Sequence, residues 1–236
     1  MTKLLTINGN PKVIKGDKLN TEWQSAIMHL HPSSTRICPY QDIAKCKDAC
    51  LNTSGRGGIF KKGETTNVIQ EARKRRTNMF LDTPDLFMEQ LYTEILKFEN
   101  KCKREGKQPC VRLNGTSDIQ WEHHELKGVN VFDTFPEIQF YDYTKIPTRK
   151  VSHIKNYHLT WSYSEANEKY ASWFDKVSYN IAVVFSHALP MWYKNRRVID
   201  GDEYDMRFLD EPNVVVGLSA KGKAKKDTSG FVISIN

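Results

Sequence analysis

The chain has 236 residues, of which 27% are charged and 39% are hydrophobic, as in an ordinary globular protein with a sizeable core. Because no apolar run approaches the length of a membrane span and the first residues are too polar for a signal peptide, we expect a cytoplasmic protein with no membrane contact. The net charge of +7 excludes no enzyme class, but it favours a partner that carries negative charge.

The sequence favours a single domain over residues 1–236. Residues 1–24 carry little signal and are expected to form an N-terminal extension of a core over residues 25–236. The core begins with an apolar run at residues 26–31, which predicts a first strand that ends at Pro32. His29 and His31 point to one side of that strand and are candidates for a fourth metal ligand.

Three of the five cysteines, Cys38, Cys46 and Cys50, follow this strand with the spacing C-x7-C-x3-C. If Cys46 and Cys50 lie on a helix, their thiols share one face, and the longer first gap lets Cys38 loop back to meet them. Three thiolates suit an iron–sulfur cluster or another soft metal. Three reduced cysteines without a ligand are the alternative reading.

Two helices are expected next, over residues 66–80 and from Thr83, a good N-cap, to Gly106. A glycine-rich segment before them, residues 55–58, permits a close backbone approach to a ligand. Basic residues form three blocks, which favour a phosphate-bearing partner such as nucleic acid. The blocks are Arg73, Lys74, Arg75 and Arg76; Lys101, Lys103, Arg104 and Lys107; and Lys221, Lys223, Lys225 and Lys226.

After residue 108, short apolar strands alternate with helical or mixed connections, and polar residues follow the strands. Strands are expected at residues 110–113, 138–141, 157–161, 180–185, 197–199 and 214–218. This alternation predicts an α/β fold with parallel strands, open or rolled into a partial (β/α)6-type barrel, with a metal-binding cysteine loop after the first core strand. Functional residues of such folds gather at the carboxyl ends of the strands.

Several segments together resemble the bacteriophage gene product 88 family. They are Cys38-Pro39-Tyr40 with Cys46 and Cys50, then residues 51–57, 112–118, 141–145, 156–160, 216–223 and 227–231. The resemblance runs from about residue 26 to residue 231. It implies a phage-encoded protein in a bacterial host cytoplasm, and the family has no established activity to carry over.

A weaker resemblance is to radical SAM enzymes, which hold a 4Fe-4S cluster on a three-cysteine loop after the first strand of a partial barrel. It implies that S-adenosylmethionine fills the fourth iron site and that an external donor supplies electrons. The departures are the spacing, C-x3-C-x2-C in those enzymes, and the turn Asn114-Gly115-Thr116-Ser117-Asp118 in place of Gly-Gly-Glu.

This resemblance assigns roles to three sets of residues. The metal ligands are Cys38, Cys46 and Cys50. The cofactor-binding residues are Asn114, Thr116, Ser117, Asp118 and Ser162. The catalytic residues are Asp142, Lys145 and Glu165, with Tyr141 lining the same cavity. We therefore expect an iron–sulfur enzyme that acts on a phosphate-bearing substrate, by modification of a nucleotide or nucleic acid.

Two other functions stay open at this point. In one, zinc on the cysteines stabilises a phage protein that binds nucleic acid through its basic blocks. In the other, a metal-dependent nuclease or phosphotransferase uses Asp118, Asp142 and the acidic run from Asp200 to Asp205. Neither the substrate nor the oligomeric state follows from the sequence.

Overall fold

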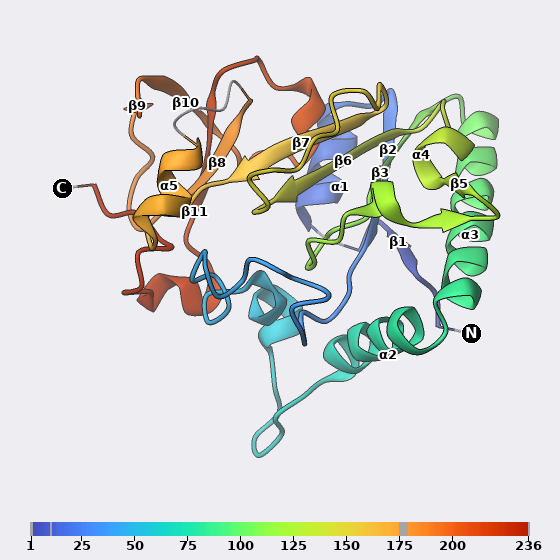
Figure 1. The fold of residues 1–236 in the computed structure, drawn as a ribbon, viewed down its shortest axis with the longest axis horizontal. Helices are drawn as coiled ribbons and strands as arrows, with labels where there is room; N and C mark the ends of the chain where they lie inside the picture. Colours follow the sequence, from blue (N-terminus) through green and yellow to red (C-terminus); the bar gives the residue numbers. More distant parts are fainter. Residues whose placement is uncertain (1, 10, 175–178, 236) are drawn as a thin grey trace.

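The fold is built on one twisted, mostly parallel sheet (Figure 1). The computed structural model describes residues 2–9, 11–174 and 179–235. Within these ranges the sheet has nine strands, in the order β1-β2-β3-β6-β7-β8-β11-β10-β9. Their bounds are Leu5–Ile7 (β1), Trp23–Met28 (β2), Gln108–Arg112 (β3), Gln139–Thr144 (β6), Tyr157–Ser162 (β7), Ile181–Phe185 (β8), Trp192–Tyr193 (β9), Arg196–Asp200 (β10) and Val215–Ser219 (β11).

All the strands from β2 to β10 in this order run parallel, which confirms the expected α/β class with parallel strands. Barrel closure, in contrast, is not seen. The strands at the two edges, β1 and β9, pair antiparallel to their single neighbours and not to each other. In addition, β11 lies between β8 and β10, so the sequential strand order of a (β/α)6 barrel is lost at this end.

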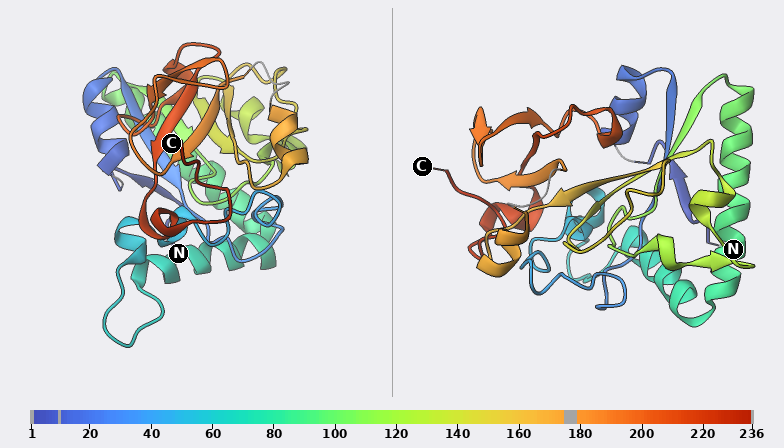
Figure 2. Two further views of the ribbon diagram at one scale, coloured as in Figure 1. Left: turned by 90° about the vertical axis from the view of Figure 1, so that its left-hand side faces the viewer. Right: turned by 45° about the horizontal axis from the view of Figure 1, so that its top comes forward.

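The two faces of the sheet are covered by different elements. On one face, Val111 and Phe140 belong to a large apolar core with α3 (Pro84–Arg104). On the other face, Cys110 and Tyr141 pack against the segment around the short helix η4 (Arg207–Leu209). This alternation is the period of two that a strand imposes on its side chains. In Figure 2 the two coverings lie on opposite sides of the strands.

The long helices form close to their expected ranges, although Thr83, the expected N-cap of α3, makes no side-chain capping hydrogen bond and its hydroxyl donates to the Met79 carbonyl instead. Helix α2 (Val68–Asp82) begins after Asn67, whose side chain accepts hydrogen bonds from the N–H groups of Ile69 and Gln70. Helix α3 has Pro84 in its first turn and buries a stripe of apolar residues. The chain leaves α3 through Gly106, which has a φ of 65°. Two short helices, α4 (Val131–Thr134) and α5 (Glu168–Phe174), follow later in the chain, and a small hairpin of β4 (Glu125–Leu126) and β5 (Val129–Asn130) precedes α4.

Residues 2–9 and 11–24 are part of the folded body rather than a peripheral extension. Strand β1 pairs with β2, and α1 (Pro11–Leu19) contacts the same strand. The Glu94 carboxylate of α3 accepts hydrogen bonds from the backbone N–H groups of Leu4 and Leu5, at 2.8–3.0 Å. Among the described residues, no helix is both long and apolar enough to cross a membrane.

Three local expectations are corrected by the observed strand and helix limits. Strand β2 ends at Met28, so His29 and His31 follow it instead of sharing one of its faces. Strand β6 continues to Thr144, which places Asp142 inside a strand and not in the loop after it. Residues 46–50 form turns and no helix, because the chain reverses at Lys45, whose φ is 53°.

Candidate functional site: a thiol cluster at the carboxyl rim of the sheet

The cysteine loop leaves the carboxyl end of β2 and is held by its own backbone. The N–H of Ala44 donates to the carbonyl of Tyr40 at 2.9 Å, and the N–H of Cys46 donates to the carbonyl of Gln41 at 3.1 Å. The Cys46 thiol points toward the same Gln41 carbonyl, at 3.7 Å. These tight turns, rather than a helix, bring Cys46 and Cys50 back toward Cys38.

The three thiols lie close enough to affect one another electrostatically. Burial raises the pKa of the Cys38 thiol far above its ordinary value, and the charges of Asp118, Cys50 and Cys46 raise it further. Burial also raises the pKa values of Cys46 and Cys50, while the nearby Lys145 ammonium lowers both. At neutral pH all three sulfurs are therefore protonated in the metal-free protein.

The two other cysteines lie apart from this cluster, as expected. Cys102 lies on α3 and is buried in the core. Cys110 lies in β3, where its sulfur is 3.3 Å from the hydroxyl oxygen of Ser25. Both are packing residues.

The turn after β3 touches the cluster. The Cys38 thiol lies 4.0 Å from the carbonyl oxygen of Thr116, and the Thr116 hydroxyl donates to the carbonyl of Leu30 at 2.5 Å. The Ser117 hydroxyl donates to the side-chain oxygen of Asn114 at 2.8 Å. The structure thus brings this turn beside the cysteines, where the sequence places it.

Asn114 and Asp142 form a buried pair that organises the turn. The Asp142 carboxylate accepts from the backbone N–H of Asn114 at 2.7 Å, from its side-chain amide at 3.2 Å and from the Tyr157 hydroxyl at 3.1 Å. Burial raises the pKa of Asp142 to about 7, against the lowering effect of Arg112 and of these donors. With its oxygens engaged inside the protein, Asp142 supports the turn and does not face a cavity.

Asp118 is likewise engaged inside the fold. Its carboxylate accepts from the Thr144 hydroxyl at 2.8 Å and from the backbone N–H of Lys145 at 2.7 Å. The Arg149 guanidinium lies 3.6 Å away and forms its shorter ion pair, 2.6 Å, with Glu122. Burial raises the pKa of Asp118, and Arg149 is the largest opposing influence. The arrangement gives Asp118 a role in fixing the loops after β3 and β6.

Lys145 is the polar side chain best placed to act near the thiols. Its ammonium donates to the Ser162 hydroxyl at 2.5 Å and lies over the Phe231 ring, 4.6 Å from the centroid. The same ammonium influences Cys46 and Cys50. Glu165, in contrast, is exposed and accepts a hydrogen bond from the Tyr193 hydroxyl, with no contact to Lys145 or Asp142 among the described residues.

Sequence reasoning missed two groups around the cluster. Arg73, expected in an exposed basic block, is buried and donates to both oxygens of Asn52 at 2.8 Å, close to Cys50. Phe231 comes from the far end of the chain and packs with Ala49 and Cys46. The signal for Arg73 was its helical spacing from Gln70, which bonds the same loop. Nothing local in the sequence marks Phe231.

The acidic residues assigned to a nuclease do not come together. Asp205 is buried between Arg112, at 2.7 Å, and Lys12, at 3.1 Å, and Arg112 is the main cause that keeps its pKa below the ordinary value. Asp202 pairs with Lys221 at 2.6 Å. Across residues 2–9, 11–174 and 179–235, no three His, Cys, Asp or Glu side chains are arranged around one point as metal ligands, the cysteines included.

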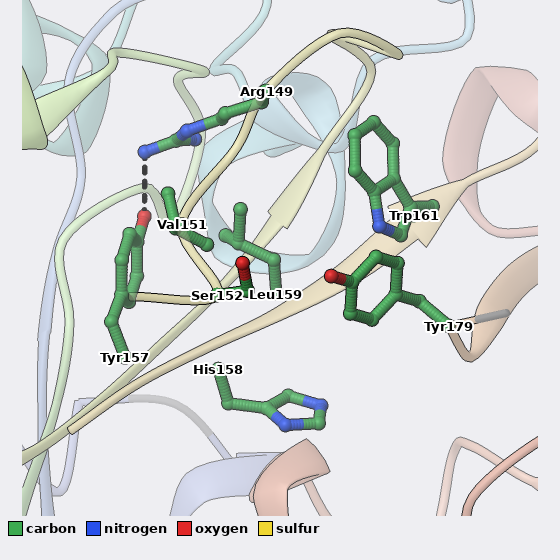
Figure 3. Close-up of a pocket in the computed structure, with 8 residues that line it drawn as sticks. All are labelled: Arg149, Val151, Ser152, Tyr157, His158, Leu159, Trp161 and Tyr179. Atoms are coloured by element: carbon green, nitrogen blue, oxygen red, sulfur yellow. Dashed lines mark hydrogen bonds between the residues drawn. The ribbon is translucent and has the colours of Figure 1, made fainter. Parts of the chain in front are cut away.

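A small cavity of about 90 Å³ lies elsewhere, beside the first half of β7 (Figure 3). Tyr157, His158 and Leu159 line it from the strand, and Arg149 donates to the Tyr157 hydroxyl at its margin at 2.7 Å. None of the site residues assigned from the sequence lines this cavity. The candidate site is therefore the thiol rim and not the cavity.

Fold and site together define a mostly parallel α/β protein whose carboxyl rim carries three neighbouring thiols. Residues 3–235 match the family model described as gene product 88, and the chain belongs to that family. The match confirms the family expected from the sequence, whereas nothing found supports a relationship to radical SAM enzymes. Comparisons with curated proteins and with solved structures found no match.

Proposed function

We propose that Cys38, Cys46 and Cys50 hold an iron–sulfur cluster and that the protein is a radical SAM-like enzyme acting on a phosphate-bearing substrate in the cytoplasm of a bacterial host. The observation that carries the proposal is the position of three cysteines in one loop after the first parallel strand, with the Cys38 thiol 4.0 Å from the Thr116 carbonyl of the turn after the neighbouring strand. Three sulfurs from one loop are the donor set of a cluster with one open iron position.

The chemistry of the donors fits, but the three sulfurs do not yet surround a common point. When bound, a 4Fe-4S cluster would supply an electron from an external donor for cleavage of S-adenosylmethionine. The chain's own contribution is to bury the three cysteines in part and to place the Lys145 ammonium where it lowers the pKa values of Cys46 and Cys50.

The geometry reduces the set of residues that are available to bind a cofactor. The Asp118 carboxylate is occupied by hydrogen bonds from Thr144 and Lys145 at the end of β6. Asn114 and Ser117 are occupied by bonds inside the turn, so they position its backbone. Ser162 and Lys145 are the side chains that remain for a ligand's carboxylate or phosphate at this rim.

Anaerobic reconstitution tests the proposal. The protein should take up iron and sulfide in equal amounts and develop the visible absorption of a cluster. The variant Cys38→Ser/Cys46→Ser/Cys50→Ser should stay colourless, while Cys102→Ser should behave as the unaltered protein. S-adenosylmethionine should then bind by calorimetry and release 5′-deoxyadenosine slowly under strong reduction. Full iron uptake without S-adenosylmethionine binding contradicts the radical chemistry.

A zinc-stabilised protein that binds nucleic acid is the second candidate. The favouring observation is that Ala49 of the cysteine loop packs with Ala220, Ala224 and Phe231 from the end of the chain. An ion on the thiols would therefore fix segments far apart in sequence. If the protein takes up zinc in place of iron and its melting temperature rises, the zinc-stabilised protein is the correct function and the iron–sulfur enzyme is not.

A further inference from the structure

Basic residues from three separate parts of the chain lie on neighbouring segments beside the cysteine loop. These segments, called here the rim surface, are residues 42–48, 56–64 and 221–227. The three segments carry nine basic and four acidic side chains, so their net charge is +5 out of +7 for the whole chain. The basic residues are Lys45, Lys47, Arg56, Lys61, Lys62, Lys221, Lys223, Lys225 and Lys226, and all are exposed.

Contacts between the segments hold the rim surface together. The short helix η5 (Gly222–Lys226) packs on the cysteine loop through Ala224 and Ala49. At Gly222 the backbone approaches the loop so closely that a Cβ would lie 2.9 Å from the hydroxyl oxygen of Ser54. The Ser229 hydroxyl donates to the Lys45 carbonyl at 3.3 Å. The lysines of η5 are thus fixed next to those of the loop.

The second segment of the rim surface, residues 56–64, projects away from the other two. The side-chain amide of Asn67 donates to the carbonyls of Arg56, Gly57 and Ile59, which anchors the segment at the start of α2. Beyond the anchor, the chain between η2 (Gly55–Gly58) and α2 extends away from the body of the protein (Figure 1). Lys61 and Lys62 are exposed in this projection.

Apolar side chains lie exposed among these charges. Ile59 is 68% exposed, Leu51 53%, Ile43 42% and Phe60 39%. Unstacked bases offer flat apolar faces beside regularly spaced phosphates, so a single strand matches this mixture better than a duplex, whose bases are covered.

The other basic blocks are less suited to such contact. Arg73 and Arg76 donate to backbone carbonyls of the protein itself. Lys101 and Lys103 form ion pairs with Glu105 and Glu99 along α3. In the rim surface, Lys221 and Lys47 are likewise paired, with Asp202 and Asp42. The η5 residues Lys223, Lys225 and Lys226, in contrast, form no ion pair with a described residue, so their charges are available to a ligand.

We propose that the rim surface binds single-stranded nucleic acid, with lysines on the phosphates and Phe60 against a base. Where the thiols hold a cluster, this strand is the substrate of the proposed enzyme, an assignment that rests on the proposed function. The binding itself does not depend on what the thiols hold.

Fluorescence anisotropy with labelled single-stranded RNA and DNA of mixed sequence tests the proposal. The variant Lys223→Glu/Lys225→Glu/Lys226→Glu should bind at least about tenfold more weakly, with a logarithmic salt slope smaller by about 2, as three lost phosphate contacts require. The matched variant Lys97→Glu/Lys103→Glu/Arg104→Glu changes the net charge equally on α3. It should bind within about twofold of the unaltered protein at physiological salt.

Two further variants probe the projection. Lys61→Glu/Lys62→Glu should weaken binding in the same salt-dependent way, and Phe60→Ala should weaken it about fivefold or more with an unchanged salt slope. Equal losses in the η5 and α3 variants, no binding at low salt, or binding to phosphatidylserine vesicles but not to oligonucleotides would each overturn the proposal.

The same samples separate this inference from the proposed enzyme. Iron content should be unchanged in the charge-reversed variants, whose altered residues are exposed. If the protein binds oligonucleotides through the rim surface but takes up no iron, the binding proposal stands and the iron–sulfur proposal is wrong. If it takes up iron fully but binds no oligonucleotide, the iron–sulfur proposal stands and the binding proposal is wrong.

Discussion

The thiol of Cys38 lies 4.0 Å from the carbonyl oxygen of Thr116, although the two residues are 78 positions apart in the chain. The contact joins the loop after β2 to the turn after β3, and these strands are parallel neighbours. The carboxyl ends of adjacent parallel strands necessarily meet at one edge of the sheet. A ligand on the thiols would therefore also meet the backbone of this turn.

Replacement of Asp118 should destabilise the fold rather than act only on a ligand. Asp118→Ala removes the partner of the Thr144 hydroxyl, of the Lys145 N–H and, in part, of the buried Arg149. We expect the free energy of unfolding to fall by about 3–5 kcal/mol, measured by urea denaturation, because a buried charge loses part of its compensation. The exposed Glu137→Ala is the control. A loss below about 1 kcal/mol would show that Asp118 is free to serve a ligand.

Metal uptake should release protons. Because burial raises the pKa values of Cys38, Cys46 and Cys50, the thiols must lose their protons when they bind a metal. Titration with zinc or ferrous ions in buffers of different ionisation enthalpy should give close to three protons per metal near pH 7, and the affinity should rise with pH. Release of one proton or none would mean that the three thiols do not bind together.

Arg73 should behave as a structural residue although it begins a run of four basic residues. Its guanidinium donates to Asn52 in the loop that follows Cys50. We expect Arg73→Ala to lower the free energy of unfolding by about 2–3 kcal/mol, as the loss of buried hydrogen bonds from a charged group implies. Lys74→Ala, whose side chain pairs with Glu71 near solvent, should change it by less than about 0.5 kcal/mol. Equal effects would contradict the assignment.

Much of the architecture was predictable because it depends on local pattern. The apolar strand at Ile181–Phe185, the start of α3 at Pro84 and the end of α3 at Gly106 all follow from periodicity and end signals. The position of the cysteine loop after the first parallel strand was predicted in the same way. These features need no knowledge of distant parts of the chain.

The remaining features depend on long-range pairing, which local pattern does not encode. The insertion of β11 between β8 and β10 decides against a sequential barrel order. The pairing of β1 with β2 makes the first residues part of the sheet. Within the site, Asp118 and Asp142 look available in sequence, yet the neighbours that engage them, Arg149 and Tyr157, come from later segments. Exposure of a polar residue is set by the whole fold.

His29 should make the folded protein sensitive to acid. Burial, followed by the nearby Arg73, Arg112 and Arg76, lowers the pKa of His29 from 6.5 to about 3. The unfolded chain therefore takes up a proton near pH 6.5 that the folded protein resists. The stability that depends on neutral His29 is fully present above pH 6.5 and is lost as the pH falls toward 3, by up to about 4 kcal/mol.

The measurement is the free energy of unfolding by urea at a series of pH values from 7 to 4. His29→Gln should flatten this dependence, and the exposed His153→Gln should leave it unchanged. Some slope should persist in His29→Gln, because the pKa of His158 is also lowered by burial, to about 4. If the His29 and His153 variants follow the same curve as the unaltered protein, His29 is not the group that couples folding to acid.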